Sequence, residues 1–406
     1  MKQADVVIVG AGQAGLALSH CLGRKGVAHA VLERGSIGER WRSESWRSLT
    51  LLTPNWLNAL PGWPYAGDDP DGFMGKDTFV ESLEAYARRW RAPVECGVEV
   101  LSCRRCGDGF ALQTSAGDWS AKAVAVATGH CDRPVIPFTI DGGPHSIHAS
   151  RYRSPGELPP GGVLVVGASS SGVQIADELA RAGRRVLLSV GKHTRLPRLW
   201  RGRDIFFWLC EMGLMAQRPE DLANPDSARH QPSLQLAGRP DRADVDLATL
   251  QALGVELAGR VEGIANGEMT FAGDLAANMA AAEVKQARLL AGIDRFAGAA
   301  RSARREPVAV LSPCAKRLSL TDGSVGSIIW ATGYARRFNW LEPLALGPDG
   351  ELAHRDGLTS VPGLYALGFR FLRKRDSNFI GGVGTDAEAI AAEICRHLDC
   401  NGLWAA

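Results

Sequence analysis

The fold is decided by the stretch Asp5-Val6-Val7-Ile8-Val9-Gly10-Ala11-Gly12-Gln13-Ala14-Gly15. Its apolar start, residues 5–9, is short, continuous and rich in β-branched side chains, which predicts a strand buried on both faces of a parallel sheet. A helical pattern follows and ends near Gly26, and a further strand over residues 29–32 finishes on Glu33. Strand, glycine-rich turn, helix, strand and acid in this order are typical of a dinucleotide-binding unit, in which the acid holds ribose hydroxyls.

Each glycine of this turn has a physical task. Gly10 allows the tight turn, and Gly12 lets a pyrophosphate approach the backbone. Gly15 lets the helix pack closely on the strand. The N-terminus of the helix then offers unpaired amides to phosphate.

A second signal of the same kind occupies residues 162–172, Gly-Val-Leu-Val-Val-Gly-Ala-Ser-Ser-Ser-Gly. Ser169 replaces the middle glycine, so the backbone is slightly less open there. A helix over residues 173–182 and a strand over 185–190 are expected to follow. The tip of that strand carries no acid but a polar and basic set, namely Ser189, Lys192, His193, Thr194, Arg195 and Arg198. Basic residues at this place favour a ribose 2′-phosphate, which indicates NADPH over NADH.

Two further strands end alike, on Ala-Thr-Gly at residues 127–129 and 331–333. Each closes a segment that begins with a glycine-rich turn. The chain therefore reads as one nucleotide-binding domain interrupted by another, with residues 1–155 and 335–406 in the first and 156–334 in the second. Residues 201–299 are expected to form a helical insertion in the second domain, with helical patterns at 205–215, 247–253 and 275–296. The predicted fold class is α/β with two Rossmann-like domains.

Composition narrows the possible functions. The 406 residues include 47 glycines and carry a formal net charge of +2. Such a charge gives no footprint for nucleic acid, which needs a concentrated basic face, so the expected partner is a small molecule. Nine cysteines, an odd number, argue against a secreted disulfide framework and favour a cytoplasmic protein. No apolar run reaches the ~18 residues of a membrane-spanning helix.

The paired fingerprints, each with an Ala-Thr-Gly strand end, resemble the flavin-dependent monooxygenases of the two-dinucleotide-binding-domain fold. That family includes flavin-containing monooxygenases, the plant indole-pyruvate monooxygenases and Baeyer–Villiger enzymes. The resemblance implies an FAD site made by Gly10, Gly12, Gln13, Ala14, Gly15, Glu33, Arg34, Arg40, Trp41, Val100, Thr128, Gly129, Gly382 and Val383. It implies an NADPH site made by Gly167, Ser169, Ser170, Ser171, Gly172, Lys192, Thr194, Arg195, Thr332 and Gly333.

The resemblance also places residues 46–64 past the flavin ring, with Leu52, Thr53 and Asn55 as pocket candidates. Many amine-oxidising members have an asparagine where Leu52 stands here, and Asn55 is the nearest amide. The family's identifying run survives only as His148 with Tyr152. A helix over residues 387–398, opened by residues 377–386, is expected to direct free amides at the pyrimidine end of the flavin.

The activity that the resemblance implies is that of a class B monooxygenase. NADPH would reduce FAD, and a C4a-(hydro)peroxyflavin formed with O2 would oxygenate a small organic substrate, by N- or S-oxygenation or in the manner of 2-oxo-acid oxygenation. The alternatives are an NADPH oxidase, a quinone- or disulfide-type flavin reductase, and a noncatalytic nucleotide-binding redox sensor.

The cysteine and histidine patterns give little support to other chemistry. The one Cys-x-x-Cys pair, Cys103 and Cys106, falls in a region of short strands, where side chains three residues apart point to opposite faces. His145 and His148 have no partnering set of cysteine, histidine or carboxylate nearby, so no metal site is expected. His148 is instead expected to couple the two domains.

Overall fold

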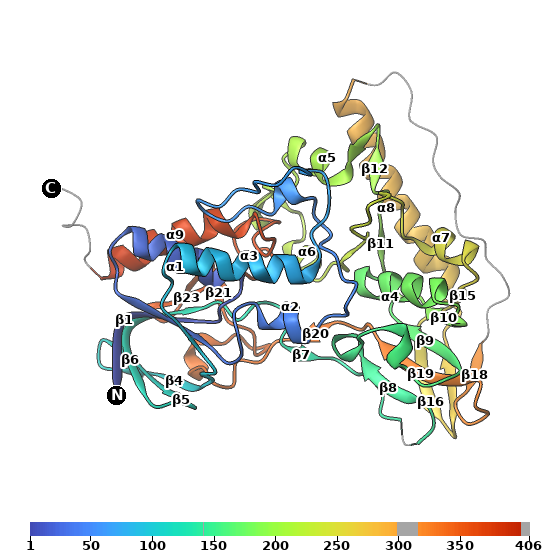
Figure 1. The fold of residues 1–406 in the computed structure, drawn as a ribbon, viewed down its shortest axis with the longest axis horizontal. Helices are drawn as coiled ribbons and strands as arrows, with labels where there is room; N and C mark the ends of the chain where they lie inside the picture. Colours follow the sequence, from blue (N-terminus) through green and yellow to red (C-terminus); the bar gives the residue numbers. More distant parts are fainter. Residues whose placement is uncertain (141, 299–315, 399–406) are drawn as a thin grey trace.

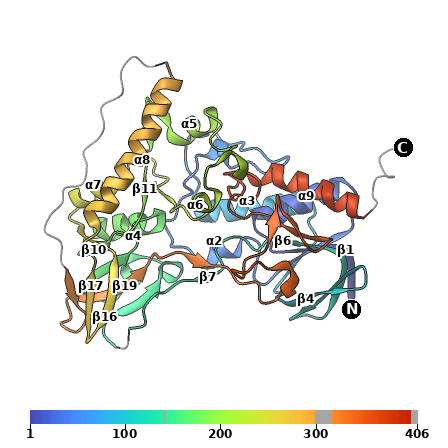
Figure 2. The same ribbon diagram turned by 180° about the vertical axis from the view of Figure 1, so that it is seen from behind.

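The computed structural model describes residues 1–140, 142–298 and 316–398. Two domains lie side by side, as Figure 1 shows and Figure 2 shows from behind. The first is built from both ends of the chain and the second from its middle. Each contains a largely parallel β-sheet with helices against it, which confirms the predicted α/β class.

The first domain is organised around a nine-stranded sheet, whose main path runs β21-β22-β23-β6-β1-β2-β3. The strands of this path are β1 (Lys2–Val9), β2 (His29–Glu33), β3 (Val94–Cys96), β6 (Trp119–Val126), β21 (His354–Arg355), β22 (Leu358–Thr359) and β23 (Leu364–Ala366). An antiparallel branch on β6 is formed by β4 (Val100–Cys106) and β5 (Gly109–Thr114). The helices of this domain are α1 (Gln13–Arg24), α2 (Glu39–Ser43), α3 (Lys76–Arg89) and α9 (Val383–His397).

The second domain has a five-stranded parallel sheet in the order β15-β10-β9-β19-β8. Its strands are β8 (His145–His148), β9 (Gly162–Val166), β10 (Val186–Ser189), β15 (Glu256–Ala258) and β19 (Val325–Trp330). The helices are α4 (Ser170–Arg181), α5 (Ile205–Glu211), α6 (Pro225–Arg229), α7 (Leu247–Ala252) and α8 (Leu275–Phe296). The central strands are buried along their length, because helices or further strands cover both faces.

Short elements complete the chain. The strand pairs are β7 (Arg133–Pro134) with β20 (Tyr334–Ala335), β11 (Thr194–Arg195) with β14 (Leu234–Gln235), and β12 (Leu199–Trp200) with β13 (Arg203–Asp204). A small antiparallel sheet joins β16 (Val261–Ala265), β17 (Glu268–Phe271) and β18 (Arg317–Ser319). Single 3-10 turns lie at Asn55–Leu57, Ala149–Arg151, Pro155–Glu157, Pro219–Asp221 and Pro343–Ala345.

Two sequence-based expectations about this fold need correction. The segment 201–299 is not simply helical, because β15 is the edge strand of the second sheet and β16 and β17 form most of an antiparallel sheet. Short apolar runs bounded by Gly254, Gly259 and Gly267 are the strand signal that the helical reading missed. The strand β8 also belongs to the second sheet although it precedes residue 156, because its backbone pairs with β19.

The helices expected from the sequence differ from the observed helices mainly at their ends. The predicted helix over 275–296 coincides with α8, while α9 begins at Val383 and not at Ala387. Its earlier start follows from the conformation of Gly382, whose φ of −74° and ψ of −28° are already helical. The crossing between the domains is made by β7 and β20, which pair antiparallel.

Candidate functional site

The first glycine-rich turn is a cradle closed on the protein side and open on the other. Gly10 has a φ of +108°, and a β-carbon there would lie 2.6 Å from the Ala127 carbonyl oxygen. A β-carbon at Gly15 would lie 1.9 Å from the Gly10 carbonyl oxygen. At Gly12, in contrast, a β-carbon would meet nothing within 4 Å. The open position is therefore the one at which a pyrophosphate is expected to approach.

Side chains around this turn also suit a dinucleotide. The Glu33 carboxylate accepts hydrogen bonds from the backbone amides of Ala11 at 2.8 Å and Gly35 at 3.0 Å, which fixes it beside the turn. The Arg40 guanidinium contacts Glu44 at 2.9 Å and lies 4.8 Å from the centre of the Tyr334 ring. Its Nη1 is buried and has no hydrogen-bond partner among the described residues, so one donor remains for a ligand.

The second turn repeats this geometry. Gly167 also has a φ of +108°, and a β-carbon there would lie 2.5 Å from the Ala331 carbonyl oxygen. A β-carbon at Gly172 would lie 1.7 Å from the Gly167 carbonyl oxygen. Ser169 has φ −84° and ψ −172°, and its counterpart Gly12 has −83° and −171°. The serine thus keeps the backbone of the glycine it replaces.

The two Ala-Thr-Gly strand ends match as well. Gly129 and Gly333 have φ values of 78° and 84°, and a β-carbon at either would meet no atom within 4 Å. His148 contacts the second of these ends, because its Nε2 lies 3.0 Å from the Gly333 carbonyl oxygen. Its Nδ1 accepts from the Ser150 amide at 3.1 Å, so Nε2 carries the proton and donates it to Gly333. Burial lowers the pKa of His148, which keeps the ring neutral where the chain leaves the second domain.

The basic segment after β10 differs from its expected role. The Arg195 side chain is 8% exposed and contacts Asp246 at 2.7 Å and Glu283 at 2.5 Å. Its guanidinium is therefore engaged by two carboxylates and does not present a free cation to a phosphate. Lys192 remains exposed at the tip of the strand, and Thr194 lies half-buried in β11.

Arg198 has a structural role that the sequence did not indicate. It is completely buried, pairs with Asp204 at 2.5 Å and donates through Nη1 to the Leu52 carbonyl oxygen at 2.7 Å. The rings of Phe73 and Phe206 lie 4.8 and 5.5 Å from its guanidinium carbon. We call residues 46–64, which contain the pocket candidates, the pocket segment. Arg198 therefore fixes the backbone of the pocket segment to the second domain.

The three pocket candidates, Leu52, Thr53 and Asn55, have different roles in the structure. Asn55 uses both ends of its amide on the backbone, donating to Asp69 O and accepting from Met74 N, each at 2.9 Å. Thr53 donates to Asn58 at 2.5 Å. The hydrogen bonds of these two residues fold the segment, and both ends of the Asn55 amide are already used within it. Leu52 belongs to an apolar cluster that also contains Trp56, Leu57, Phe206 and Phe379.

The C-terminal turn packs against the same segment. A β-carbon at Gly381 would lie 2.2 Å from the Leu57 carbonyl oxygen, and one at Gly382 would lie 2.0 Å from the Asp376 carbonyl oxygen. The N-terminus of α9 therefore lies beside residues 55–59. In the first turn of α9, Asp386 is 1% exposed, a buried carboxylate to which sequence reasoning gave no role.

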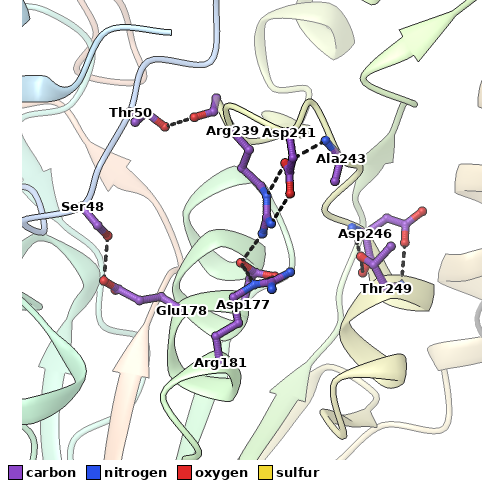
Figure 3. A network of polar contacts seen from close by, with 11 residues as sticks. Ser48, Thr50, Asp177, Glu178, Arg181, Arg239, Asp241, Ala243, Asp246 and Thr249 are labelled. Carbon is purple, nitrogen blue, oxygen red and sulfur yellow. Dashed lines mark hydrogen bonds and ion pairs between the residues drawn. The ribbon is translucent and has the colours of Figure 1, made fainter. Parts of the chain in front are cut away.

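A set of polar contacts joins the pocket segment to the second domain, and Figure 3 shows it. Ser48 donates to Glu178 of α4 at 2.7 Å, and Thr50 donates to the Gly238 carbonyl oxygen at 2.5 Å. Within the second domain itself, Arg239 contacts Asp177 of α4 at 3.0 Å, which fixes residues 238–241 against that helix. Together with Arg198, the contacts of Ser48 and Thr50 hold the pocket segment against α4 and residues 238–241.

The two cysteines of the Cys-x-x-Cys pair differ in burial. Cys103 is buried while Cys106 is exposed on the same strand, and both are free thiols. In the described ranges, no group of three or more histidine, cysteine or acidic side chains is placed to hold a metal ion. Within the same residues, no helix is long and apolar enough to cross a membrane.

Comparison with known proteins shows which proteins share this arrangement. The profile of the pyridine nucleotide-disulphide oxidoreductase family matches residues 7–198. An uncharacterized CzcO-like oxidoreductase of Geobacillus kaustophilus is 31% identical over 97% of this chain and 99% of its own. An indole-3-pyruvate monooxygenase of Oryza sativa subsp. japonica is 27% identical over 96% of this chain and 90% of its own. A solved flavin-containing monooxygenase from Stenotrophomonas maltophilia aligns with a TM-score of 0.67 at 19% identity, over 98% of this chain and 100% of that one.

The relative from Geobacillus kaustophilus spans both nucleotide units and the return segment, so the likeness extends over the whole architecture described above. The monooxygenase structure, at its low identity, supports the fold. The chain therefore belongs to the CzcO-like oxidoreductases, and it is a flavin-dependent oxidoreductase of the two-dinucleotide-binding-domain fold with FAD and NADP(H) as cofactors.

Proposed function

We propose that this enzyme is an NADPH-dependent FAD monooxygenase that oxygenates a small organic substrate. In the overall reaction NADPH, a proton, O2 and the substrate give NADP⁺, water and the substrate with one added oxygen atom. The observation that carries this proposal is the presence of two geometrically equivalent nucleotide turns, each closed behind by close backbone contacts and open where a pyrophosphate approaches.

The chain's own residues would bind and orient the two cofactors. FAD would lie along the first turn, with its ribose at Glu33, its pyrophosphate over Gly12 and the free donor of Arg40 beside it. NADPH would lie along the second turn, with its pyrophosphate at Ser169 and its 2′-phosphate near Lys192. When bound, the pair supplies hydride transfer and O2 activation. The protein contributes position and a site from which water is excluded.

Apolar residues near the expected flavin position favour oxygenation of an organic molecule. Leu52, Trp56 and Phe379 come from the pocket segment and the C-terminal turn, and they pack with residues of α5. The indole-3-pyruvate monooxygenases among the relatives act, by their names, on a 2-oxo acid. Oxygenation of a 2-oxo acid, or of a nitrogen or sulfur atom, is therefore the proposed chemistry. A cytoplasmic location stays a prediction from the cysteine content.

The rival activity is that of a disulfide-type reductase, which the name of the matching family profile suggests. Such an enzyme needs two cysteines that can pair beside the flavin. Cys103 and Cys106 point to opposite faces of β4, and Cys103 lies 2% exposed within the core of the first domain. This arrangement favours the monooxygenase over the reductase. An NADPH oxidase differs only in releasing peroxide.

The fate of oxygen tests the proposal. The purified yellow enzyme is reduced with NADPH and mixed with ¹⁸O2 and a panel of 2-oxo acids, amines and thioethers. One ¹⁸O atom in a product, with little hydrogen peroxide, is the expected result. Stoichiometric peroxide with every compound would instead identify an oxidase. Colourless protein that binds NADPH but holds no FAD would leave the noncatalytic nucleotide-binding sensor as the better description.

A further inference from the structure

An enclosed carboxylate lies at the start of α9. Asp386 is 1% exposed, and its Oδ2 has no hydrogen-bond partner in the part of the chain that the structure describes. It lies on the buried side of the first helical turn, as Val383 does. Gly382 and Val383, which open this helix, are among the residues expected at the flavin. A buried carboxylate oxygen without a donor is costly, so its presence at this place calls for a functional explanation.

The surroundings of Asp386 compensate its charge only in part. The Ser377 hydroxyl hydrogen-bonds the carboxylate and is itself completely buried. The Nε of Arg373 lies 3.9 Å from Oδ1, too far for a hydrogen bond. The nearby Lys374 is 3.2 Å from a second carboxylate, that of Asp376. This loop therefore brings the buried carboxylate of Asp386 and the half-buried carboxylate of Asp376 together against one paired lysine and one more distant arginine.

Helix α1 also packs on α9, and none of its groups is among the causes that shift the pKa of Asp386. From α1, His20 and Cys21 interact with Glu388, which is exposed on the outer side of α9. Burial raises the pKa of Asp386 to about 6, the Ser377 hydrogen bond and the charges of Lys374 and Arg373 oppose this, and Asp376 adds to it. The carboxylate is therefore poised to change protonation near neutral pH when another negative charge arrives.

We propose that Asp386 binds the proton that compensates the charge gained by FAD on reduction. This inference rests on the proposed function, because it requires FAD along the first turn and the N-terminus of α9. A hydride brings two electrons and one proton to the flavin, which leaves one added negative charge on it. A second proton comes from solvent and forms an O–H bond on the Asp386 carboxylate. No other group is oxidised or reduced, and the charge of the enclosed site is conserved.

The physical reason is the low polarity around Asp386. In such surroundings two neighbouring negative charges repel more strongly than in water, so the second charge raises the proton affinity of the first. The side chain of Arg373, which lies 3.9 Å from the carboxylate, is itself 30% exposed to solvent. Proton uptake at Asp386 therefore makes reduction of FAD more favourable as the pH falls.

Redox titration of the FAD-loaded protein between pH 5.5 and 8 tests the proposal. In the wild type, the midpoint potential is expected to fall with pH more steeply than in Asp386→Asn. Above pH 6 the difference should approach a tenfold change in the reduction equilibrium per pH unit, about 30 mV for a two-electron couple. Glu388→Gln, on the same helix but exposed, is the matched control and should follow the wild type.

A second variant keeps the test decisive if Asp386→Asn loses FAD. Ser377→Ala removes a hydrogen bond that favours the charged carboxylate, so the steep part of the curve should move to higher pH. Equal slopes in the wild type and Asp386→Asn, or an unmoved curve in Ser377→Ala, would overturn the role of Asp386. Failure of the wild type itself to hold FAD would instead refute the proposed function.

Discussion

Replacing Gly15 by alanine tests whether the first cradle is held by direct contact of backbone with backbone. The new β-carbon would lie 1.9 Å from the Gly10 carbonyl oxygen. Carbon and carbonyl oxygen normally stay about 3.3 Å apart or more, so helix and turn would have to separate by roughly 1.4 Å. Overpacking of this kind costs about 1–3 kcal/mol, and the upper end applies because no flexible side chain can yield. Alanine recovers about 1 kcal/mol of helix propensity over glycine, which leaves a net loss of about 2 kcal/mol.

Gly12→Ala is the matched control on the same turn. A β-carbon there meets nothing within 4 Å, and its φ of −83° is accessible to any residue. The free energy of unfolding of the FAD-free protein should therefore change by less than about 0.5 kcal/mol. The same methyl group would stand where the pyrophosphate approaches, so FAD affinity should fall.

Two measurements separate these effects. Thermal unfolding of the FAD-free proteins should place Gly15→Ala about 4–8 °C below the wild type, with Gly12→Ala unchanged. Absorbance of bound flavin in the purified proteins should fall for Gly12→Ala. Wild-type unfolding of Gly15→Ala, or undiminished FAD content in Gly12→Ala, would refute the assignment of scaffold and cofactor roles within the turn.

Three further predictions follow from the ion pairs and buried groups. Arg195→Met leaves Asp246 buried without its cation, so unfolding in urea should show a loss of about 3–5 kcal/mol, while KM values for NADPH and NADH change alike. Lys192→Ala should raise KM for NADPH several-fold more than for NADH, and equal effects would remove the 2′-phosphate from this place. Burial, with Arg229 and Arg336 nearby, lowers the pKa of His354 from 6.5 to about 4, so the unfolded chain binds more protons than the folded one in that window. The free energy of unfolding should therefore fall as the pH drops from 6.5 toward 4, and His354→Gln should show a flatter pH dependence.

The nucleotide units could be read from the sequence because their requirements are local. A φ of +108° at Gly10 and Gly167 needs glycine, and the close approach at Gly15 excludes any side chain. Within each nucleotide unit, these requirements fall within a dozen residues of sequence, and a buried strand and a helix must flank them. The bounds of α8 could also be predicted from the local sequence, since a long alanine-rich segment has few alternatives to a helix.

The site details could not be read in this way, because they depend on partners distant in the chain. Arg195 looked free for a phosphate until the fold brought Asp246 and Glu283 against it. Asn55 was a pocket candidate because it is the amide nearest to Leu52, and only the fold shows that its neighbours in the loop use both ends of that amide. A charge or an amide in a sequence shows what a side chain can do, and only its neighbours show which of these interactions is already made.

The sequence by itself determined that this protein has two dinucleotide cradles on an α/β fold, because the first and last glycines of each turn meet a backbone requirement that no other residue satisfies. The tertiary structure alone decided which polar atoms remain without a partner near the first cradle and the helix expected beside it, among them Nη1 of Arg40 and Oδ2 of Asp386. The reason is that burial and pairing are properties of the packed chain. A buried group left without a partner marks where a ligand, or a proton, completes the structure.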